Sequence, residues 1–270
     1  MGKSSVPTVV LILLILSGAV HPGGFIQNED SSRVSDRAWS EDSALIEKRP
    51  AAAENVLVLE PAGIRLGAGE LREPLGLAVD ARGFVYVADA MTGKVFRYST
   101  DGESVEFEKP FLSPSLYPID VAVYGSFVYV LDYSENRVLR YDHNGAYLDI
   151  LLSFDEFGKM HPSSLTAGEG GRIATTDIEN HTLTIWTPLL DIELTLGGYG
   201  WSEGRMDRPM KAAILPDDRI VVVESGNRRV QLFSPAGSFE KVLSLPEEMR
   251  FRSPRSISSD FMGFIFVADT

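Results

Sequence analysis

From residue 54 onward the sequence repeats itself about every 45 residues, and no other feature constrains the fold as strongly. Prolines recur at corresponding places in five successive cycles: Pro74, Pro118, Pro162, Pro209 and Pro254. An acidic residue follows each proline by fourteen or fifteen positions: Asp89, Asp132, Asp177, Glu224 and Asp269. These acidic residues are 43, 45, 47 and 45 positions apart. Two interlocked series that keep register over five cycles indicate five copies of one structural unit.

The best-defined cycles contain four short runs rich in β-branched, aromatic and leucine residues, which strands favour. In the first two cycles these runs span residues 75–80, 84–89, 94–99, 104–108, 120–124, 127–132, 137–142 and 147–153. Asp101-Gly102 and Asn144-Gly145 are typical of β-hairpin turns, because glycine accepts the positive φ that such turns require. Helical periodicity is nearly absent. The sequence therefore predicts four antiparallel strands in each cycle.

Four short strands every 45 residues or so are typical of the blades of a β-propeller. A single blade cannot bury both of its faces, so blades stack around an axis and bury each other. The small residues Ala78, Ala122 and Ala213 fall at equivalent places in the first strand and fit a crowded channel wall. We therefore predict an all-β chain: a β-propeller of four-stranded antiparallel blades, with about four and a half blades in residues 54–270.

The fifth cycle contains only its first two strands and reaches residue 270. We expect Val56–Leu59 to be the outer strand that closes the last blade, and the rest of the ring to come from further residues or from another molecule. An open edge at residue 270 would favour pairing with a strand of another chain, because edge strands present unpaired backbone groups.

Residues 1–19 have the features of a secretory signal peptide. Lys3 gives a positive start, residues 9–16 are all apolar, and Ser17-Gly18-Ala19 resembles a cleavage site. The apolar stretch is shorter than the roughly 17–25 residues that cross a bilayer. We therefore expect cleavage and no stable membrane insertion, with an uncleaved anchor as the alternative. Residues 20–53 are polar and mixed in charge, which predicts a disordered linker before a secreted or periplasmic propeller.

Composition narrows the functional classes. A formal net charge of −13 argues against nucleic-acid binding, which requires Lys and Arg side chains that neutralise phosphates. The absence of cysteine excludes disulfides, thiolate chemistry and zinc–sulfur sites. The sequence also lacks the motifs of zinc peptidases, P-loops and nucleophile elbows. We therefore expect no cofactor.

Three recurring features resemble those of NHL repeats. They are a glycine-rich lead-in to the proline (LGAGELREP, residues 66–74), a second strand ending in Val87-Ala88-Asp89, and an Asn-Arg element such as Asn136-Arg137 or Asn227-Arg228. The joint pattern resembles the NHL-repeat family of β-propellers over residues 54–270, and this resemblance implies a six-bladed ring. The third cycle departs from the pattern at Asn180-His181-Thr182, and the fourth ends its second strand in Glu224.

The acidic residue that ends each second strand is expected to be structural. A carboxylate in this place accepts backbone N–H groups of a turn and meets the nearby Asn or Arg. A ring of bound cations is the alternative interpretation. Because the residue recurs once in every cycle, we favour an architectural role for all five: Asp89, Asp132, Asp177, Glu224 and Asp269.

The binding candidates lie on the face that carries the connections between blades, because its longer loops are where propellers tend to bind. Trp201 is flanked by glycines, so of the aromatic residues on this face it is the one we most expect to be exposed; Tyr199 is a second candidate. Guanidinium groups on the same face suit a carboxylate or another anion: Arg205, Arg208, Arg228, Arg252 and Arg255. The alternatives are partly buried aromatic rings and solvated arginines that pair with nearby acids.

We therefore predict an extracytoplasmic, non-catalytic binding or scaffold module for a protein, peptide or glycan. The alternative is a hydrolase or lyase that holds calcium or zinc in the propeller channel, by analogy with lactonase-like and amidating-lyase propellers. Asp120, at the start of an inner strand, is the candidate ligand under that alternative. His143, His161 and His181 fall in different cycles, so we do not expect them to share a metal.

Overall fold

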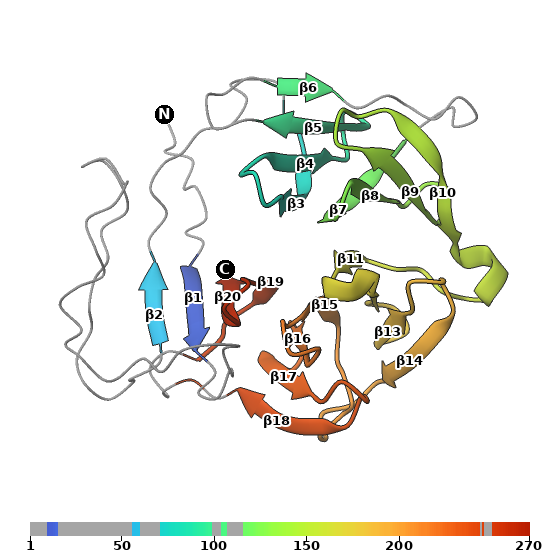
Figure 1. Ribbon diagram of the computed structural model, residues 1–270. Coiled ribbons are helices and arrows are strands. Elements are labelled where there is room, and N and C mark those ends of the chain that lie inside the picture. The colour runs from blue at the N-terminus through green and yellow to red at the C-terminus, as the bar shows by residue number, and fades with distance from the viewer. Residues whose placement is uncertain are drawn as a thin grey trace, which may run out of the picture.

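The computed structural model describes residues 71–98, 104–106, 116–243, 245 and 250–270, and also strands 10–15 and 56–59. These residues form five four-stranded antiparallel sheets, which we call blades one to five. Figure 1 shows the five blades arranged around a central axis, with the first strand of each blade innermost. The chain is therefore an all-β propeller, as the repeat predicts.

The strand bounds follow the repeat closely. Blade one contains β3 (Pro74–Val79), β4 (Val85–Asp89), β5 (Lys94–Tyr98) and β6 (Ser104–Glu106). Blade two contains β7 (Pro118–Tyr124), β8 (Phe127–Asp132), β9 (Arg137–Asp142) and β10 (Tyr147–Ser153). Blade three contains β11 (Ser164–Ala167), β12 (Ile173–Asp177), β13 (Thr182–Trp186) and β14 (Ile192–Gly197). Blade four contains β15 (Pro209–Ile214), β16 (Ile220–Glu224), β17 (Arg229–Phe233) and β18 (Phe239–Leu243).

Blade five is completed from the other end of the chain. Its inner strands are β19 (Pro254–Ser259) and β20 (Phe264–Asp269), and its outer strands are β1 (Val10–Ile15) and β2 (Val56–Leu59). Strand β2 is the outer strand, as expected, but the third position is taken by β1, which lies inside the predicted signal peptide. The remainder of residues 1–19 and the predicted linker at 20–53 lie outside the described residues.

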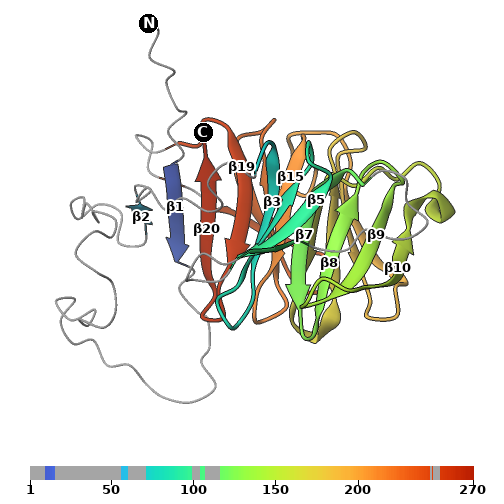
Figure 2. The same ribbon diagram turned by 90° about the horizontal axis from the view of Figure 1, so that it is seen from above.

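Apolar clusters between successive blades form the core. Between blades one and two, the Tyr86 side chain of β4 belongs to the same buried cluster as Val121 of β7. Between blades four and five, Val221 of β16 and Ile257 of β19 share another. Each blade thereby removes one apolar face of its neighbour from water, which is the main favourable contribution to folding here. Figure 2 shows the strands of successive blades standing side by side around the ring.

Each repeated carboxylate fastens its own blade to the segment that precedes the proline. Asp89 accepts backbone N–H bonds from Arg72 at 2.6 Å and Glu73 at 3.0 Å, and Asp269 accepts them from Arg252 and Ser253. The same connection is made in blades two, three and four by Asp132, Asp177 and Glu224. All five carboxylates therefore accept backbone N–H groups of the segment before the proline, whereas the sequence predicts bonds to the turn that follows.

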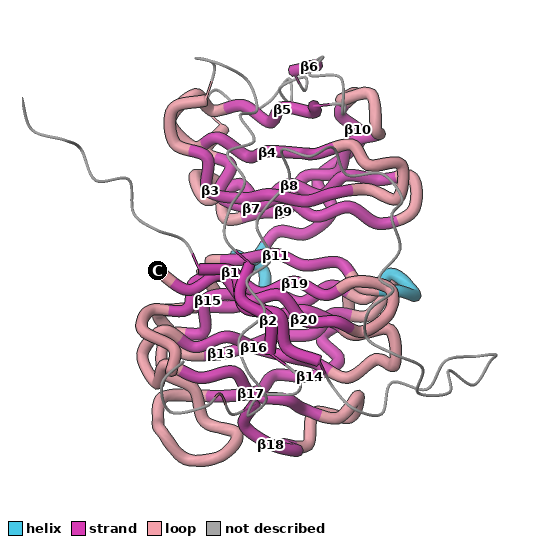
Figure 3. The backbone as a smooth tube through the Cα atoms, turned by 90° about the vertical axis from the view of Figure 1, so that its left-hand side faces the viewer, coloured by secondary structure: helices cyan, strands magenta, loops and turns pink. Residues whose placement is uncertain are grey.

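Helical structure is minimal in the described residues. Two short 3-10 turns, η1 (Phe154–Phe157) and η2 (Glu169–Gly171), are visible in Figure 3 among strands and loops. No helix in this part of the chain has the length and apolarity needed to cross a membrane.

Candidate functional site

The most exposed large aromatic pair on the connection face lies in residues 198–206, which we call the aromatic loop. The loop joins β14 of blade three to β15 of blade four. The Trp201 side chain is 79% exposed and Tyr199 is 66% exposed. Backbone hydrogen bonds close the loop on itself, because Met206 N–H donates to the Gly198 carbonyl and Gly200 N–H donates to the Met206 carbonyl, both at 3.0 Å. The structure therefore exposes both rings, although the sequence favours exposure for Trp201 alone.

Glycines permit this tight loop. Gly198 has φ 80° and Gly204 has φ 75°, in the left-handed region that side chains with a Cβ rarely adopt. A Cβ at Gly198 would also lie 2.7 Å from Nη1 of Arg205. The glycines that flank Trp201 in the sequence therefore serve the backbone of the loop.

Beneath the loop lies a buried carboxylate with four hydrogen-bond donors. Glu224, at the end of β16, has no exposed surface. Its oxygens accept the backbone N–H of Asp207 at 2.8 Å, the side-chain amides of Asn227 at 2.6 Å and Gln231 at 2.7 Å, and Nε of Arg229 at 2.7 Å. A buried charge is tolerated when it is paired and hydrogen-bonded, and Glu224 meets both conditions.

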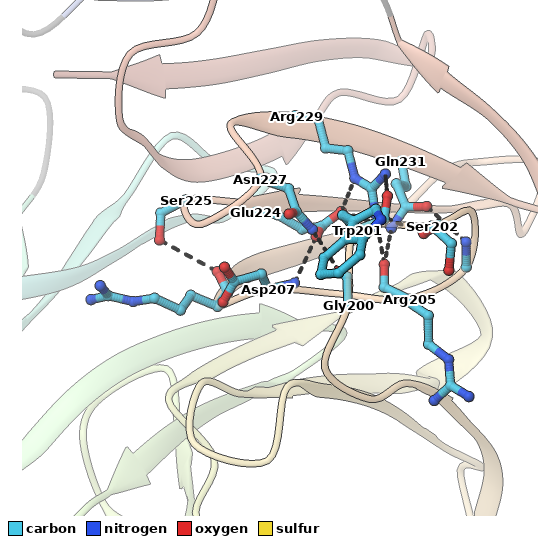
Figure 4. Close-up of polar contacts among 12 residues, drawn as sticks. Gly200, Trp201, Ser202, Arg205, Asp207, Glu224, Ser225, Asn227, Arg229 and Gln231 are labelled. Carbon is cyan, nitrogen blue, oxygen red and sulfur yellow. Dashed lines mark hydrogen bonds and ion pairs between the residues drawn. The ribbon is translucent and has the colours of Figure 1, made fainter.

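The side chains that hold Glu224 also hold the aromatic loop, as Figure 4 shows. Arg229 donates from Nη1 to the Trp201 carbonyl at 2.8 Å, and from Nη2 to the carbonyls of Ser202 and Arg205. Gln231 donates to the Arg205 carbonyl and accepts the Gly204 N–H. The backbone on both sides of Trp201 is thus fixed from blade four, while its indole projects into solvent.

Sequence reasoning missed Arg229 and Gln231 as loop supports. The available signal was the pair Arg228-Arg229 after Asn227. In β17 the second arginine is the cross-strand partner of Glu224, so it points at the carboxylate. Blade two offers a comparison, because Arg137 there reaches Asp132 through Nε at 3.1 Å, and its buried Nη2 has no partner in the described structure.

The predicted arginines do not form one cluster. Arg205 belongs to the aromatic loop and donates to the Gly197 carbonyl at 3.3 Å. Arg208 and Arg228 flank it, because Ser225 N–H donates to the Arg208 carbonyl at 3.1 Å and so joins their two segments. Their guanidinium groups are exposed and have no hydrogen-bond or ion-pair partner among the described residues. Arg252 and Arg255 lie on blade five instead.

His181 connects blade three to the same site. Its Nδ1 accepts the backbone N–H of Arg208 at 3.0 Å, and its ring meets the Tyr199 ring edge-on at 4.9 Å. Nδ1 also lies 3.5 Å from a carboxylate oxygen of Asp207. His143 bonds the Tyr86 hydroxyl in blade one, so the two histidines are apart. The described residues include no group of three or more His, Cys, Asp and Glu side chains arranged to hold a metal ion.

The propeller axis contains a second polar feature. Asp120, on β7, is 3% exposed, and both of its oxygens lie 2.8 Å from Nζ of Lys211 on β15. Its oxygens also accept the backbone N–H groups of Val121 at 2.9 Å and Leu165 at 2.8 Å. An ammonium group therefore already neutralises the carboxylate that was the candidate metal ligand.

A cavity of about 600 Å³ opens beside this ion pair. Tyr117, Tyr133, Met210 and Arg255 line it together with the inner strands β3, β7 and β19. Arg255 thus belongs to the channel wall and not to the aromatic loop.

The comparisons with known proteins show the fold. No family model matches the chain. Virginiamycin B lyase from Staphylococcus aureus is similar at 16% identity and a TM-score of 0.54, over 72% of this chain and 62% of that one. A nidogen/laminin complex is similar at 18% identity and a TM-score of 0.55, over 69% of this chain and 68% of that one. A gluconolactonase from Xanthomonas campestris is similar at 16% identity and a TM-score of 0.54, over 73% and 70%.

This chain spans about three fifths of the length of the virginiamycin B lyase that it resembles. At these identities the similarity concerns architecture alone, and the propeller fold hosts both enzymes and binding proteins. The chain is a β-propeller whose neighbours in structure include a lyase, a gluconolactonase and a member of a protein complex.

Proposed function

We propose that this chain is a non-catalytic binding module of NHL type, which engages a protein, peptide or glycan through the aromatic loop. The observation that carries the proposal is Trp201: its indole is 79% exposed although the loop beneath it is held by a fully bonded network. Large exposed aromatic residues are over-represented among the residues that dominate binding energy.

The rigidity of the loop strengthens this interpretation. Binding through a mobile loop loses free energy when the loop becomes ordered, whereas a loop that is already fixed avoids that cost. Arg229 and Gln231 supply the order in advance by bonding loop carbonyls. Side chains that serve only to fold a blade have no need to hold an indole in solvent.

The charges around the loop favour a partner that carries carboxylates. The protein has a formal net charge of −13, yet Arg208 and Arg228 present guanidinium groups beside the loop that no described acid neutralises. Arginine pairs with carboxylates through two parallel hydrogen bonds, which gives both affinity and orientation. An acidic peptide or an acidic glycan meets both the aromatic and the cationic features.

The experiment is a screen of peptide and glycan arrays followed by titration of the strongest binder. Trp201→Ala should weaken binding about tenfold or more, the loss typical of an aromatic anchor. Phe261→Ala is the matched control. Phe261 is 82% exposed but lies in the β19–β20 turn, on the face of the propeller opposite to the connections between blades. Equal affinity of wild type and Trp201→Ala for every binder would overturn the proposal.

The structurally similar lyase and gluconolactonase show that this fold can carry catalysis. The residues of the channel give little support for a catalytic function in this chain. A divalent cation on Asp120 would have to displace Lys211, whose ammonium lies 2.8 Å from both carboxylate oxygens. The binding module is therefore the function that these residues support best. We further propose that it acts outside the cytoplasm, on the strength of the signal-like features of residues 1–19.

A further inference from the structure

The cavity beside the Asp120–Lys211 ion pair has the size of a small-molecule site. Its volume is about 600 Å³, and residues of the inner strands of all five blades line it. Cavities that hold small organic molecules span roughly 300–1,000 Å³ and combine apolar walls with a few polar groups. Tyr133 and Arg255 line the cavity and are exposed, so it can be reached from solvent.

The charged groups of this cavity leave one positive charge. Among the described residues its charged lining consists of Asp120, Lys211 and Arg255. Asp120 and Lys211 neutralise each other. The Arg255 guanidinium has no hydrogen-bond or ion-pair partner within the described part of the chain. The cavity therefore favours an anion, although the protein as a whole has a formal net charge of −13.

Hydrogen-bond donors exceed free acceptors around the ion pair. Both Asp120 oxygens face Nζ of Lys211, and they also accept the N–H groups of Val121 and Leu165. An ammonium group has three N–H donors. Two of those of Lys211 face Asp120, and the third has no acceptor in the described structure. A molecule that brings oxygen acceptors therefore fits this cavity better than one that brings donors.

The remaining wall is largely apolar and aromatic. Tyr117 precedes β7 and Tyr133 follows β8, and their ring centroids are 6.3 Å apart with an interplanar angle of 58°. The two side chains are 39% and 54% exposed, and Ile119 and Met210 line the cavity with them. Covering such rings with an apolar group removes their surface from water, which is favourable. The cavity thus combines a cationic part with an apolar part.

We propose that this cavity binds a small organic carboxylate with an apolar or aromatic body. The carboxylate accepts hydrogen bonds from Arg255, because a guanidinium group forms two parallel bonds with such a group. The apolar body covers Tyr117, Tyr133 and Met210. None of the residues that line the cavity belongs to the aromatic loop, so this site is separate from the one under Proposed function.

The proposal is tested by titrating the protein with phenylacetate and octanoate in a calorimeter. Each carboxylate should bind at least about tenfold more tightly than its own amide, which keeps the body and loses the charge, a difference of about 1.4 kcal/mol. Acetate, which keeps the charge and lacks the body, should also bind at least about tenfold more weakly than phenylacetate.

Two substitutions assign the binding to this cavity. Arg255→Gln should weaken phenylacetate binding at least about tenfold, because the carboxylate loses its charged partner. Tyr133→Ala should weaken it as well, since part of the aromatic wall is removed. Arg72→Gln is the matched control: Arg72 is exposed and precedes the inner strand of blade one, but it does not line the cavity. Circular dichroism first establishes that each variant is folded.

Four results would each overturn the proposal. They are the absence of saturable binding, equal affinity for the carboxylates and their amides, equal affinity of wild type and Arg255→Gln, and inorganic phosphate that binds as tightly as phenylacetate. The last result would show that the apolar wall contributes nothing. Loss of phenylacetate binding in Trp201→Ala with full binding in Arg255→Gln would place the carboxylate on the aromatic loop instead and would equally reject this site.

Discussion

The tandem arginines of blade four show how adjacent residues divide between structure and binding. Arg229 donates hydrogen bonds to Glu224 and to three carbonyls of the aromatic loop. Arg228, one position earlier, is exposed and has no hydrogen-bond or ion-pair partner in the described structure. The two side chains have the same chemistry and opposite surroundings. What separates them is their place in the chain: Arg228 lies in the turn before β17 with φ 52°, whereas Arg229 begins β17 as the cross-strand partner of Glu224.

This contrast gives a matched pair of substitutions. Arg229→Ala should lower the free energy of unfolding by about 3 kcal/mol, because it leaves the Glu224 carboxylate buried without its cation. Arg228→Ala should change it by no more than about 0.5 kcal/mol, as expected for an exposed side chain. Urea denaturation measures both values. Equal stability of the two variants would show that the network does not hold the loop.

Asp89 gives a pH-dependent prediction at the same scale. Burial alone would raise its pKa, but hydrogen bonds from the Thr92 and Arg72 backbone and the Thr92 hydroxyl outweigh burial and lower the pKa below the ordinary value. A lowered native pKa means that the ionised carboxylate stabilises the fold above the unfolded pKa, near 4, and that this contribution is lost as the pH falls through the native value.

Asp89→Asn should therefore be less stable than wild type at pH 7, and the difference should shrink as the pH falls below about 4. Thermal unfolding from pH 7 to pH 2 measures it. Glu179→Gln, at an exposed position with no hydrogen-bond or ion-pair partner among the described residues, serves as the control and should show no comparable trend. A stability difference between Asp89→Asn and wild type that does not depend on pH would show that the charge of Asp89 does not contribute to stability.

At the scale of elements, the repeat predicts the strands of blades one to four and the inner two strands of blade five, but not β1. Periodic prolines and acids located the inner and second strands, because each carboxylate must meet the backbone before its own proline. Blade three keeps this device although its turn sequence departs from the pattern: Asp177 still accepts the N–H groups of His161 and Asn180. The aromatic loop could be located from its glycines and Trp201, but its support could not, since Arg229 reaches it across about 27 positions.

Strand β1 is assigned differently by the sequence and by the structure: the sequence predicts a signal peptide, and the structure has a strand of blade five. An apolar run such as residues 9–16 suits the hydrophobic region of a signal peptide, and it also suits a strand with apolar faces. In the structure Ile12 pairs with Val267 of β20 and with Val58 of β2. A cleaved signal peptide would remove this strand and expose the edge of β20.

The intact mass of exported protein distinguishes the two fates of β1. Expression in a secreting host should yield a mature chain that begins near residue 20, since the small residues Ser17, Gly18 and Ala19 suit a signal peptidase. A mass that retains residues 10–15 would contradict cleavage and would assign the segment to blade five. The same chain, expressed in the cytoplasm so that its N-terminus is kept, provides the reference mass.

At the scale of the whole molecule, a single ion pair joins distant parts of the ring. Lys211 and Asp120 are 91 positions apart and belong to blades four and two, while Leu165 of blade three donates its N–H to the same carboxylate. No spacing in the sequence predicts this contact, because it exists only when the blades have closed around the axis. Three blades therefore meet at one buried carboxylate.

Removing one partner of this pair should affect the whole ring. Lys211→Ala leaves the Asp120 charge buried and unpaired, so we expect a loss of about 3 kcal/mol in the free energy of unfolding. The double variant Lys211→Met with Asp120→Asn removes both charges, keeps similar volumes, and should recover most of that loss, since a buried pair contributes little net stability. Urea denaturation of the two variants and of wild type measures the difference. If Lys211→Ala unfolded like wild type, the carboxylate would have to be reached by water, and the channel would be open to a cation from solution.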